Sequence, residues 1–185
     1  MLSITLVIII ATVVISLAAF NNSKVMNDLI FYPPAIHYQK QYYRFITSGF
    51  IHGDYVHLIF NMLSFYFFGP AVEELFIRIF DPSTGRVLYL VLYFSALIVC
   101  LLPTYAKNKD NNYYMGLGAS GAVSAVIFAA IMFQPQLKIG FLFIPFIHIP
   151  GFLFGPLFLV ISAYLGKKGG SNINHSAHIW GALYG

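Results

Sequence analysis

The chain has 185 residues, of which 59% are hydrophobic and only 9% are charged, and its mean hydropathy is +0.78. A soluble domain carries about 25% charged residues, so this composition excludes a soluble protein and predicts an integral membrane protein. The net charge of +4 comes from scattered Lys and Arg, which excludes a nucleic-acid partner and favours contact with the headgroups of a lipid bilayer. Cys100 is the single cysteine, so no intrachain disulfide can form.

Six apolar segments follow one another, at residues 2–20, 55–72, 87–105, 117–133, within 139–165, and from 176 onward. Four of them are long enough for a span of about 20 residues. The first has no basic residue before it and exceeds the apolar run of a signal peptide, so we interpret it as a spanning helix. The fifth contains three prolines, so we expect an irregular or re-entrant start and a helix beginning near Gly151. The sixth reaches Gly185 after ten residues, and we expect it to be a truncated helix.

Residues 21–54 form the long connection between the first two segments. Tyr and Phe alternate there with His, Lys and Arg, which is typical of the membrane interface. We expect short amphipathic helices lying partly in the bilayer. The sequence contains no repeat, low-complexity tract or linker, so residues 1–185 are expected to form one domain.

Polar residues gather where the second, fourth and sixth segments begin. Successive spans alternate in direction, so these three segments run the same way and start at one membrane face. The second opens with His57 and Asn61, the fourth with Ser120, and the sixth with His178. Because polar groups inside spans cost free energy, they are candidates for function.

Ser120 stands between Gly118 and Gly121 at the start of its segment. A serine hydroxyl becomes a strong nucleophile only when a base accepts its proton. Taken alone, the pattern is more often a small residue at a helix interface. The glycines permit a tight turn and a close helix contact, and the N–H groups at a helix start can stabilise an anion. These features favour a nucleophile with oxyanion donors beside it.

Small residues on the fourth and sixth segments predict that these helices pack closely. The fourth carries a stripe at Gly121, Ala125 and Ala129, and the sixth carries Gly181 and Gly185 four residues apart. Such stripes allow backbone contact in membranes. Ser120 and His178 both lie near the starts of these segments, so a Ser–His hydrogen bond is predicted. The alternative for His178 is a bond to a nearby carbonyl.

His57 and Asn61 are one helical turn apart and share a face. Both can donate hydrogen bonds to a developing oxyanion, although they can equally form a polar clasp between helices. His52, five residues before His57, can join the same cavity. Glu73 and Glu74 fall at the opposite end of this segment. No Asp or Glu lies in any apolar segment near this face, so the sequence predicts a Ser–His dyad rather than a triad.

With these residues, the chain resembles the rhomboid intramembrane serine proteases. The resemblance runs from about residue 42 to the end and is carried by three motifs in order: "HGDYVHLIFN" at 52–61, "GASG" at 118–121 and "AHIWGALYG" at 177–185. "YYRF" at 42–45, with Arg44, is similar to the family's aromatic-arginine element in the first loop. "FFGPAVEELF" is similar to the cytoplasmic end of the family's second helix. The resemblance implies an all-α, six-transmembrane-helix bundle with a long interfacial first loop.

The resemblance also implies a role for each matching residue. Ser120 would attack a peptide bond and His178 would be the general base. His57, Asn61 and the Ser120 N–H would form the oxyanion hole, and Gly118 would permit the loop geometry. The substrate would be a transmembrane protein, cut near the membrane face after a small residue. No metal or other cofactor is implied.

One departure concerns the support of the histidine. Many members of the family place an aromatic residue one turn after the serine, where it packs on the histidine, but this chain has Ser124 there. We expect the support to come from Tyr113 or Tyr114.

The basic residues bear on orientation in the membrane. The resemblance implies a prokaryotic inner or plasma membrane with the active site facing outward, and we expect that orientation. The opposite face would hold only Arg78, Arg86 and Lys138, whereas the site's face would hold Lys24, Lys40, Arg44, Lys107, Lys109, Lys167 and Lys168. The positive-inside rule favours the reverse orientation, and a longer C-terminal tail would shift this balance.

Two other functions are compatible with parts of the sequence. One is a membrane protein that holds a metal or haem with His52, His57, His175 and His178. The absence of an HExxH motif speaks against it. The other is a non-catalytic, rhomboid-like protein that binds membrane clients. Such relatives typically lose the serine or the histidine, and this chain retains both.

Overall fold

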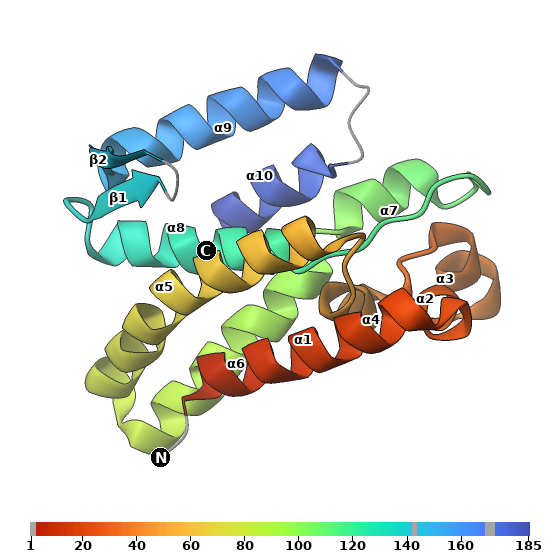
Figure 1. Ribbon diagram of the computed structural model, residues 1–185, viewed down its shortest axis with the longest axis horizontal. Coiled ribbons are helices and arrows are strands. Elements are labelled where there is room, and N and C mark those ends of the chain that lie inside the picture. Colours follow the sequence, from red (N-terminus) through yellow and green to blue (C-terminus); the bar gives the residue numbers. More distant parts are fainter. Residues whose placement is uncertain (1–2, 142–143, 169–172) are drawn as a thin grey trace.

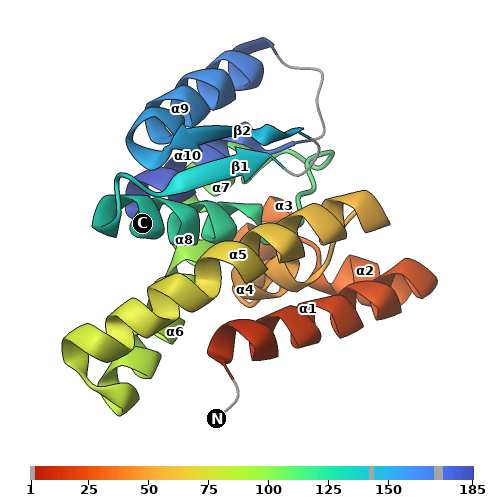
Figure 2. The same ribbon diagram turned by 60° about the vertical axis from the view of Figure 1, so that its left-hand side comes forward.

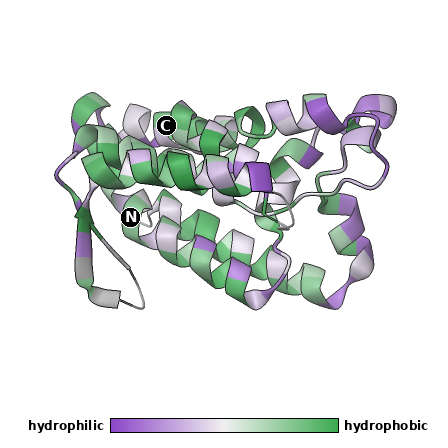
Figure 3. Ribbon diagram, turned by 90° about the horizontal axis from the view of Figure 1, so that it is seen from above, coloured by the Kyte–Doolittle hydropathy of each residue, from purple (hydrophilic) through white to green (hydrophobic). Residues whose placement is uncertain are grey.

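The computed structural model describes residues 3–141, 144–168 and 173–185. Long helices lie side by side, and the short helices of the first loop gather at one end (Figure 1). The main helices of the described chain are α1 (Ile4–Asn21), α5 (Tyr55–Phe80), α6 (Pro82–Val99), α8 (Ser120–Phe133), α9 (Gly151–Lys168) and α10 (His175–Tyr184). Hydrophobic residues cover most of their length, and hydrophilic residues gather mainly toward the end that holds the first loop (Figure 3).

Three helical stretches of the described chain are long and apolar enough to cross a membrane. They are Ile4–Asn21, Tyr55–Phe80 and Pro82–Asn108, the last of which contains α6 and α7 (Leu102–Asn108). Helix α8 is apolar but has 14 residues. The helical bundle is therefore confirmed, whereas the count of six spans stays a prediction.

One segment departs from the all-α prediction. Strands β1 (Lys138–Phe141) and β2 (Ile144–Pro150) form an antiparallel hairpin where we expected irregular or re-entrant chain. Proline removes a helical N–H but fits an extended backbone, and pairing of the two strands satisfies backbone groups that an irregular segment would leave open. Helix α9 begins at Gly151, as predicted.

The first loop folds into short helices, as predicted: α2 (Ser23–Leu29), α3 (Pro33–Gln39), α4 (Arg44–Thr47) and the 3-10 helix η1 (Ser48–Phe50). Arg44 is buried, and its Nη1 donates to the carbonyls of Asn27 at 2.8 Å and Ile30 at 2.7 Å. Phe31 exchanges backbone hydrogen bonds of 2.9 and 3.0 Å with Gly116. These bonds fix the loop against the segment that leads into α8.

Glu73 holds the start of α1 against α5. Its carboxylate accepts hydrogen bonds from Ser3 Oγ at 2.6 Å, from the N–H of Ile4 at 2.8 Å and of Thr5 at 3.1 Å, and from Thr5 Oγ1 at 3.0 Å. The first N–H groups of a helix have no partner within the helix, and a negative charge is favourable there. Glu73 is thus a buried helix cap.

Helices α8 and α10 pack backbone to backbone in the middle of the bundle, where they lie side by side (Figures 1 and 2). A Cβ added at Gly181 would lie 2.0 Å from the carbonyl oxygen of Gly121, and one at Gly185 would lie 1.9 Å from that of Ala125. The two backbones can approach this closely only because glycine has no Cβ at these two positions of α10. The predicted contact between the two small-residue stripes is confirmed.

Candidate active site

Ser120 and His178 are brought together by the starts of two helices that run in the same direction. Ser120 is the first residue of α8, and His178 lies in the first turn of α10. Nε2 of His178 is 2.7 Å from Oγ of Ser120. Both residues are half-buried. The hydrogen bond expected from the sequence is therefore present.

Gly118 shapes the backbone beside Ser120. Its φ is +106°, a value that favours glycine. Its N–H donates to the carbonyl of Ser48 at 2.9 Å. A Cβ at this position would lie 2.7 Å from Cε1 of His57. The loop before the serine thus passes directly against the His57 ring, and only glycine leaves room for it.

His57 and Asn61 lie on the first two turns of α5. The His57 N–H donates to Oδ1 of Asp54 at 2.7 Å, which caps the helix. Asn61 is buried, and its Nδ2 donates to the His57 carbonyl at 3.0 Å. In the described chain this bond stays within α5, so the alternative of a clasp between helices is not observed.

His52 supports His57 from behind. It is fully buried, and its ring packs at 76° against the His57 ring with 4.9 Å between centroids. Ser16 Oγ donates to the carbonyl of Phe50 at 3.0 Å, so the 3.0 Å contact with His52 Nδ1 must use an Nδ1–H donor. Burial, assisted by the neighbouring His57, lowers the pKa of His52 to about 3. The ring is therefore neutral, and His52 is a neighbour of His57 rather than of Ser120.

The expected support of His178 by Tyr113 or Tyr114 is wrong. Tyr113 is 96% exposed, and Tyr114 packs edge-on against Phe31, 6.5 Å between centroids. The backbone pairing of Phe31 with Gly116 draws this segment toward the first loop. Two other rings lie against His178: Phe158 of α9, 6.2 Å away at 30°, and His175, 6.0 Å away at 80°.

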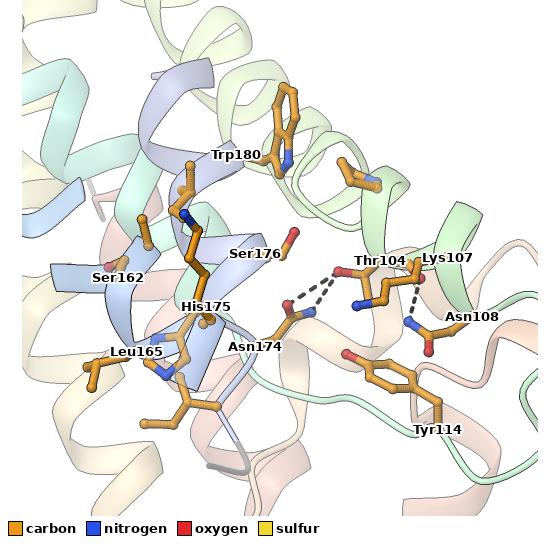
Figure 4. Close-up of a pocket in the computed structure, with 16 residues that line it drawn as sticks. Thr104, Lys107, Asn108, Tyr114, Ser162, Leu165, Asn174, His175, Ser176 and Trp180 are labelled. Atoms are coloured by element: carbon orange, nitrogen blue, oxygen red, sulfur yellow. Dashed lines mark hydrogen bonds between the residues drawn. The ribbon is translucent and has the colours of Figure 1, made fainter. Parts of the chain in front are cut away.

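Asn174 positions the start of α10 and was missed by the sequence analysis. Its Oδ1 accepts from the N–H of Ala177 at 3.1 Å. Its Nδ2 donates to Thr104 Oγ1 at 3.1 Å (Figure 4). It therefore caps α10 and joins it to α7. Asparagine directly before an apolar helical segment is a recognisable N-cap signal, but the partner on α7 has no local signature.

Two cavities border this region. A cavity of about 430 Å³ lies between α7, α9 and α10 and is lined by Thr104, Lys107 and His175 among others (Figure 4). A smaller one of about 20 Å³ is lined by Ser120, Gly118 and neighbouring residues. A void of about 10–15 Å³ or more can hold one water, so the smaller cavity has room for a water next to the serine.

Neither a carboxylate nor a metal-binding cluster accompanies the pair in the part of the chain that the structure describes. In residues 3–141, 144–168 and 173–185, no Asp or Glu side chain bonds His178, and Glu73 lies at the far end of α5. Within the same residues, no group of three His, Cys, Asp or Glu side chains is arranged to hold a metal ion. The geometry around Ser120 is that of a serine–histidine pair.

Comparison with known proteins decides the family. The family model of the rhomboid domain matches residues 39–185. The chain belongs to the rhomboid family. Among relatives of this rhomboid, RHOMBOID-like protein 12, mitochondrial, from Arabidopsis thaliana is 34% identical over 74% of the chain and 42% of the relative.

Two further relatives are more distant. Presenilin-associated rhomboid-like protein A, mitochondrial, from Danio rerio is 28% identical over 76% of the chain and 35% of the relative. The "Putative rhomboid protease YdcA" of Bacillus subtilis is 27% identical over 78% of the chain and 64% of the relative. The chain thus spans between about a third and two thirds of their lengths. With the apolar helices, these matches identify a rhomboid membrane protein.

Proposed function

We propose that this rhomboid is an intramembrane serine endopeptidase, with residues 1–185 as one protease domain and Ser120 and His178 as its catalytic dyad. The 2.7 Å distance between His178 Nε2 and Ser120 Oγ is the observation that carries the proposal. A nucleophile within hydrogen-bond reach of a base is the arrangement that acyl transfer needs. The intact pair also favours catalysis over a client-binding role alone.

The first half of the reaction forms an acyl-enzyme. Ser120 Oγ attacks the carbonyl carbon of the scissile peptide bond while His178 Nε2 takes the hydroxyl proton. The carbonyl oxygen of the scissile bond becomes an oxyanion, which accepts hydrogen bonds from the Ser120 N–H, His57 and Asn61. When the intermediate collapses, the C–N bond breaks and His178 donates its proton to the leaving amine. The acyl group is then held as an ester on Ser120.

The oxyanion hole is supported by two features of the structure. The N–H groups of the first turn of α8 have no partner within the helix, so they can stabilise a negative charge. The His57 ring lies against Gly118, two residues from the serine. Donors fixed in position before the reaction stabilise the developing charge without reorganisation.

In the second half of the reaction, water attacks the ester carbon as His178 takes its proton. The C–O bond to Ser120 then breaks, and the serine recovers its proton from His178. The new carboxyl end leaves with one fragment. The cavity of about 20 Å³ beside Ser120 offers a place for this water.

We propose transmembrane proteins as the substrates, cut near the membrane face after a small residue. The site lies at the starts of apolar helices, so a peptide bond must reach it from a neighbouring span or its flank. Neither a metal nor another cofactor takes part in the proposed steps.

The experiment uses the whole chain in detergent. A serine-directed fluorophosphonate should label the wild type and not Ser120→Ala, and only the wild type should cleave a transmembrane substrate whose helix contains destabilising residues. Cleavage by Ser120→Ala would refute the proposal that the protein is a serine protease. Binding of the substrate with neither labelling nor cleavage would instead support the client-binding function.

We further propose a prokaryotic plasma membrane, with the active site facing outward. A bacterial relative supports this membrane, whereas two relatives named above are mitochondrial. Orientation can be tested with Tyr113→Cys, because Tyr113 is 96% exposed and the native Cys100 is only 2% exposed. A membrane-impermeant maleimide should label this variant in intact cells. Labelling only after lysis would show that the active site faces the cytoplasm.

A further inference from the structure

Two rings pack against the imidazole of His178. Phe158 lies against it at 30° with 6.2 Å between centroids, and His175 approaches edge-on at 80° and 6.0 Å. In the part of the chain that the structure describes, no carboxylate bonds His178. In a Ser-His-Asp site that third group fixes the ring of the base, and the two packed rings are the candidates for this role here.

Phe158 bridges the two helices that carry the dyad. Besides His178 on α10, its ring contacts Phe128 on α8, 5.6 Å away. A Cβ on Gly155, one turn earlier on α9, would lie 3.4 Å from Phe128, so α9 approaches α8 closely at this point. The Phe158 ring is thereby held from both sides, and its position relative to His178 is defined.

The residue one turn after Ser120 on α8 provides no ring for His178. Ser124 is buried, and its Oγ donates to the Ser120 carbonyl at 2.8 Å. It therefore interacts with its own helix and presents no ring to His178. The stacking partner comes from α9.

We propose that Phe158 is a positioning residue for the proposed base His178, and that it keeps Nε2 directed at Ser120. The inference rests on the proposed protease function. The terminal torsion of a histidine side chain has a broad energy profile, so an imidazole without a stacked neighbour samples a range of orientations. Rotation of the ring moves Nε2 away from Oγ, and the proton transfer slows while the substrate still binds.

The test compares substitutions at Phe158 with a matched control on the same helix. Phe154 stacks on Phe158 with 5.9 Å between centroids, and no ring contact joins it to His178 in the described chain. Phe158→Leu should lower kcat about 10- to 100-fold, because misplacement by about 1 Å can cost 10²-fold. Its KM should stay close to the wild-type value. Phe158→Tyr should restore kcat, and Phe154→Leu should lower it much less than Phe158→Leu does, because Phe128 still contacts the Phe158 ring.

Several results would overturn the inference. They are a wild-type kcat in Phe158→Leu, an equal loss in Phe154→Leu, or a loss in Phe158→Tyr as large as that in Phe158→Leu. If Phe158→Leu does not fold, Phe158→Met, which keeps the side-chain volume close, is measured in its place and is expected to show the same loss. A wild type that cleaves while Ser120→Ala does not, together with an unaffected Phe158→Leu, would refute only the positioning role. A wild type that neither cleaves nor reacts with fluorophosphonate would refute the protease itself.

Discussion

The contact between α8 and α10 allows a sharp test with a single methyl group. A Cβ at Gly181 would lie 2.0 Å from the Gly121 carbonyl oxygen, whereas ordinary contact begins at 3.4 Å. The obstacle is backbone on a helix that is buried along most of its length, so α10 has to retreat by roughly the 1.4 Å difference between those two distances. Because His178 is on α10, its 2.7 Å bond to Ser120 would be lost.

Gly181→Ala should therefore reduce kcat about 10²-fold or more, since about 1 Å of misplacement can have that effect, and Gly181→Leu should abolish cleavage. The assay is cleavage of one transmembrane substrate in detergent, with the thermal midpoint measured in parallel. Gly155→Ala is the matched control, because it is also a buried helical glycine but its Cβ would meet Phe128 at an ordinary 3.4 Å. A Gly181→Ala protein as active as Gly155→Ala would show that the packing argument is wrong.

Further predictions concern the dyad, the oxyanion hole, pH and the α1 cap. Ser120→Ala and His178→Ala should each lower kcat by at least about 10⁴-fold. The double variant should be scarcely slower than either single variant, because neither residue works without the other. A much slower double variant would contradict the dyad. His57→Ala should cost about 10- to 10³-fold in kcat, and a loss as large as that of Ser120→Ala would argue against a role limited to the oxyanion. The pKa of His52 in the folded chain is about 3, below its unfolded value of about 6.5, so the unfolded chain binds more protons between these values. Stability should fall as pH drops below 6.5, by up to about 1.4 kcal/mol per pH unit. His52→Asn should weaken this slope, and thermal unfolding followed at pH 5 to 7.5 tests it. Glu73→Gln should lower the thermal midpoint and leave kcat per folded molecule unchanged, because the carboxylate caps α1 far from Ser120; a selective loss of kcat would contradict that.

Much of the site was predictable because its determinants are local. Apolar length and composition indicated α1 and most of α5 and α6. Glycines spaced four apart indicated the contact of α10 with α8, since only small residues allow such an approach. Because the segments of α8 and α10 run in the same direction, their starts were expected at one membrane face, with Ser120 and His178 at the same depth. The structure brings these two residues within hydrogen-bond distance. The catalytic roles of these residues remain proposals.

The features that sequence reasoning missed depend on contacts between distant residues. Helix α5 continues beyond the predicted apolar segment, residues 55–72, to Phe80, past the buried Glu73. A charged residue normally marks the end of a predicted apolar segment. The Glu73 carboxylate, however, accepts hydrogen bonds from the start of α1, 68 to 70 residues away in sequence. The hairpin of β1 and β2 was missed for a similar reason, because proline spacing shows where a helix stops but not which strand pairs with it.

The support of His178 shows why such contacts matter for the chemistry. Charged groups are costly to bury, and a buried ion pair repays its desolvation only with excellent geometry. Around this histidine the described chain uses neutral groups instead: the Phe158 ring stacks on it, and the Asn174 amide caps its helix and bonds Thr104. Neutral groups can fix the direction of an imidazole at a lower desolvation cost than a carboxylate. A serine–histidine pair within a membrane can therefore be oriented by packing and capping, provided that the residues supplying them stay in place.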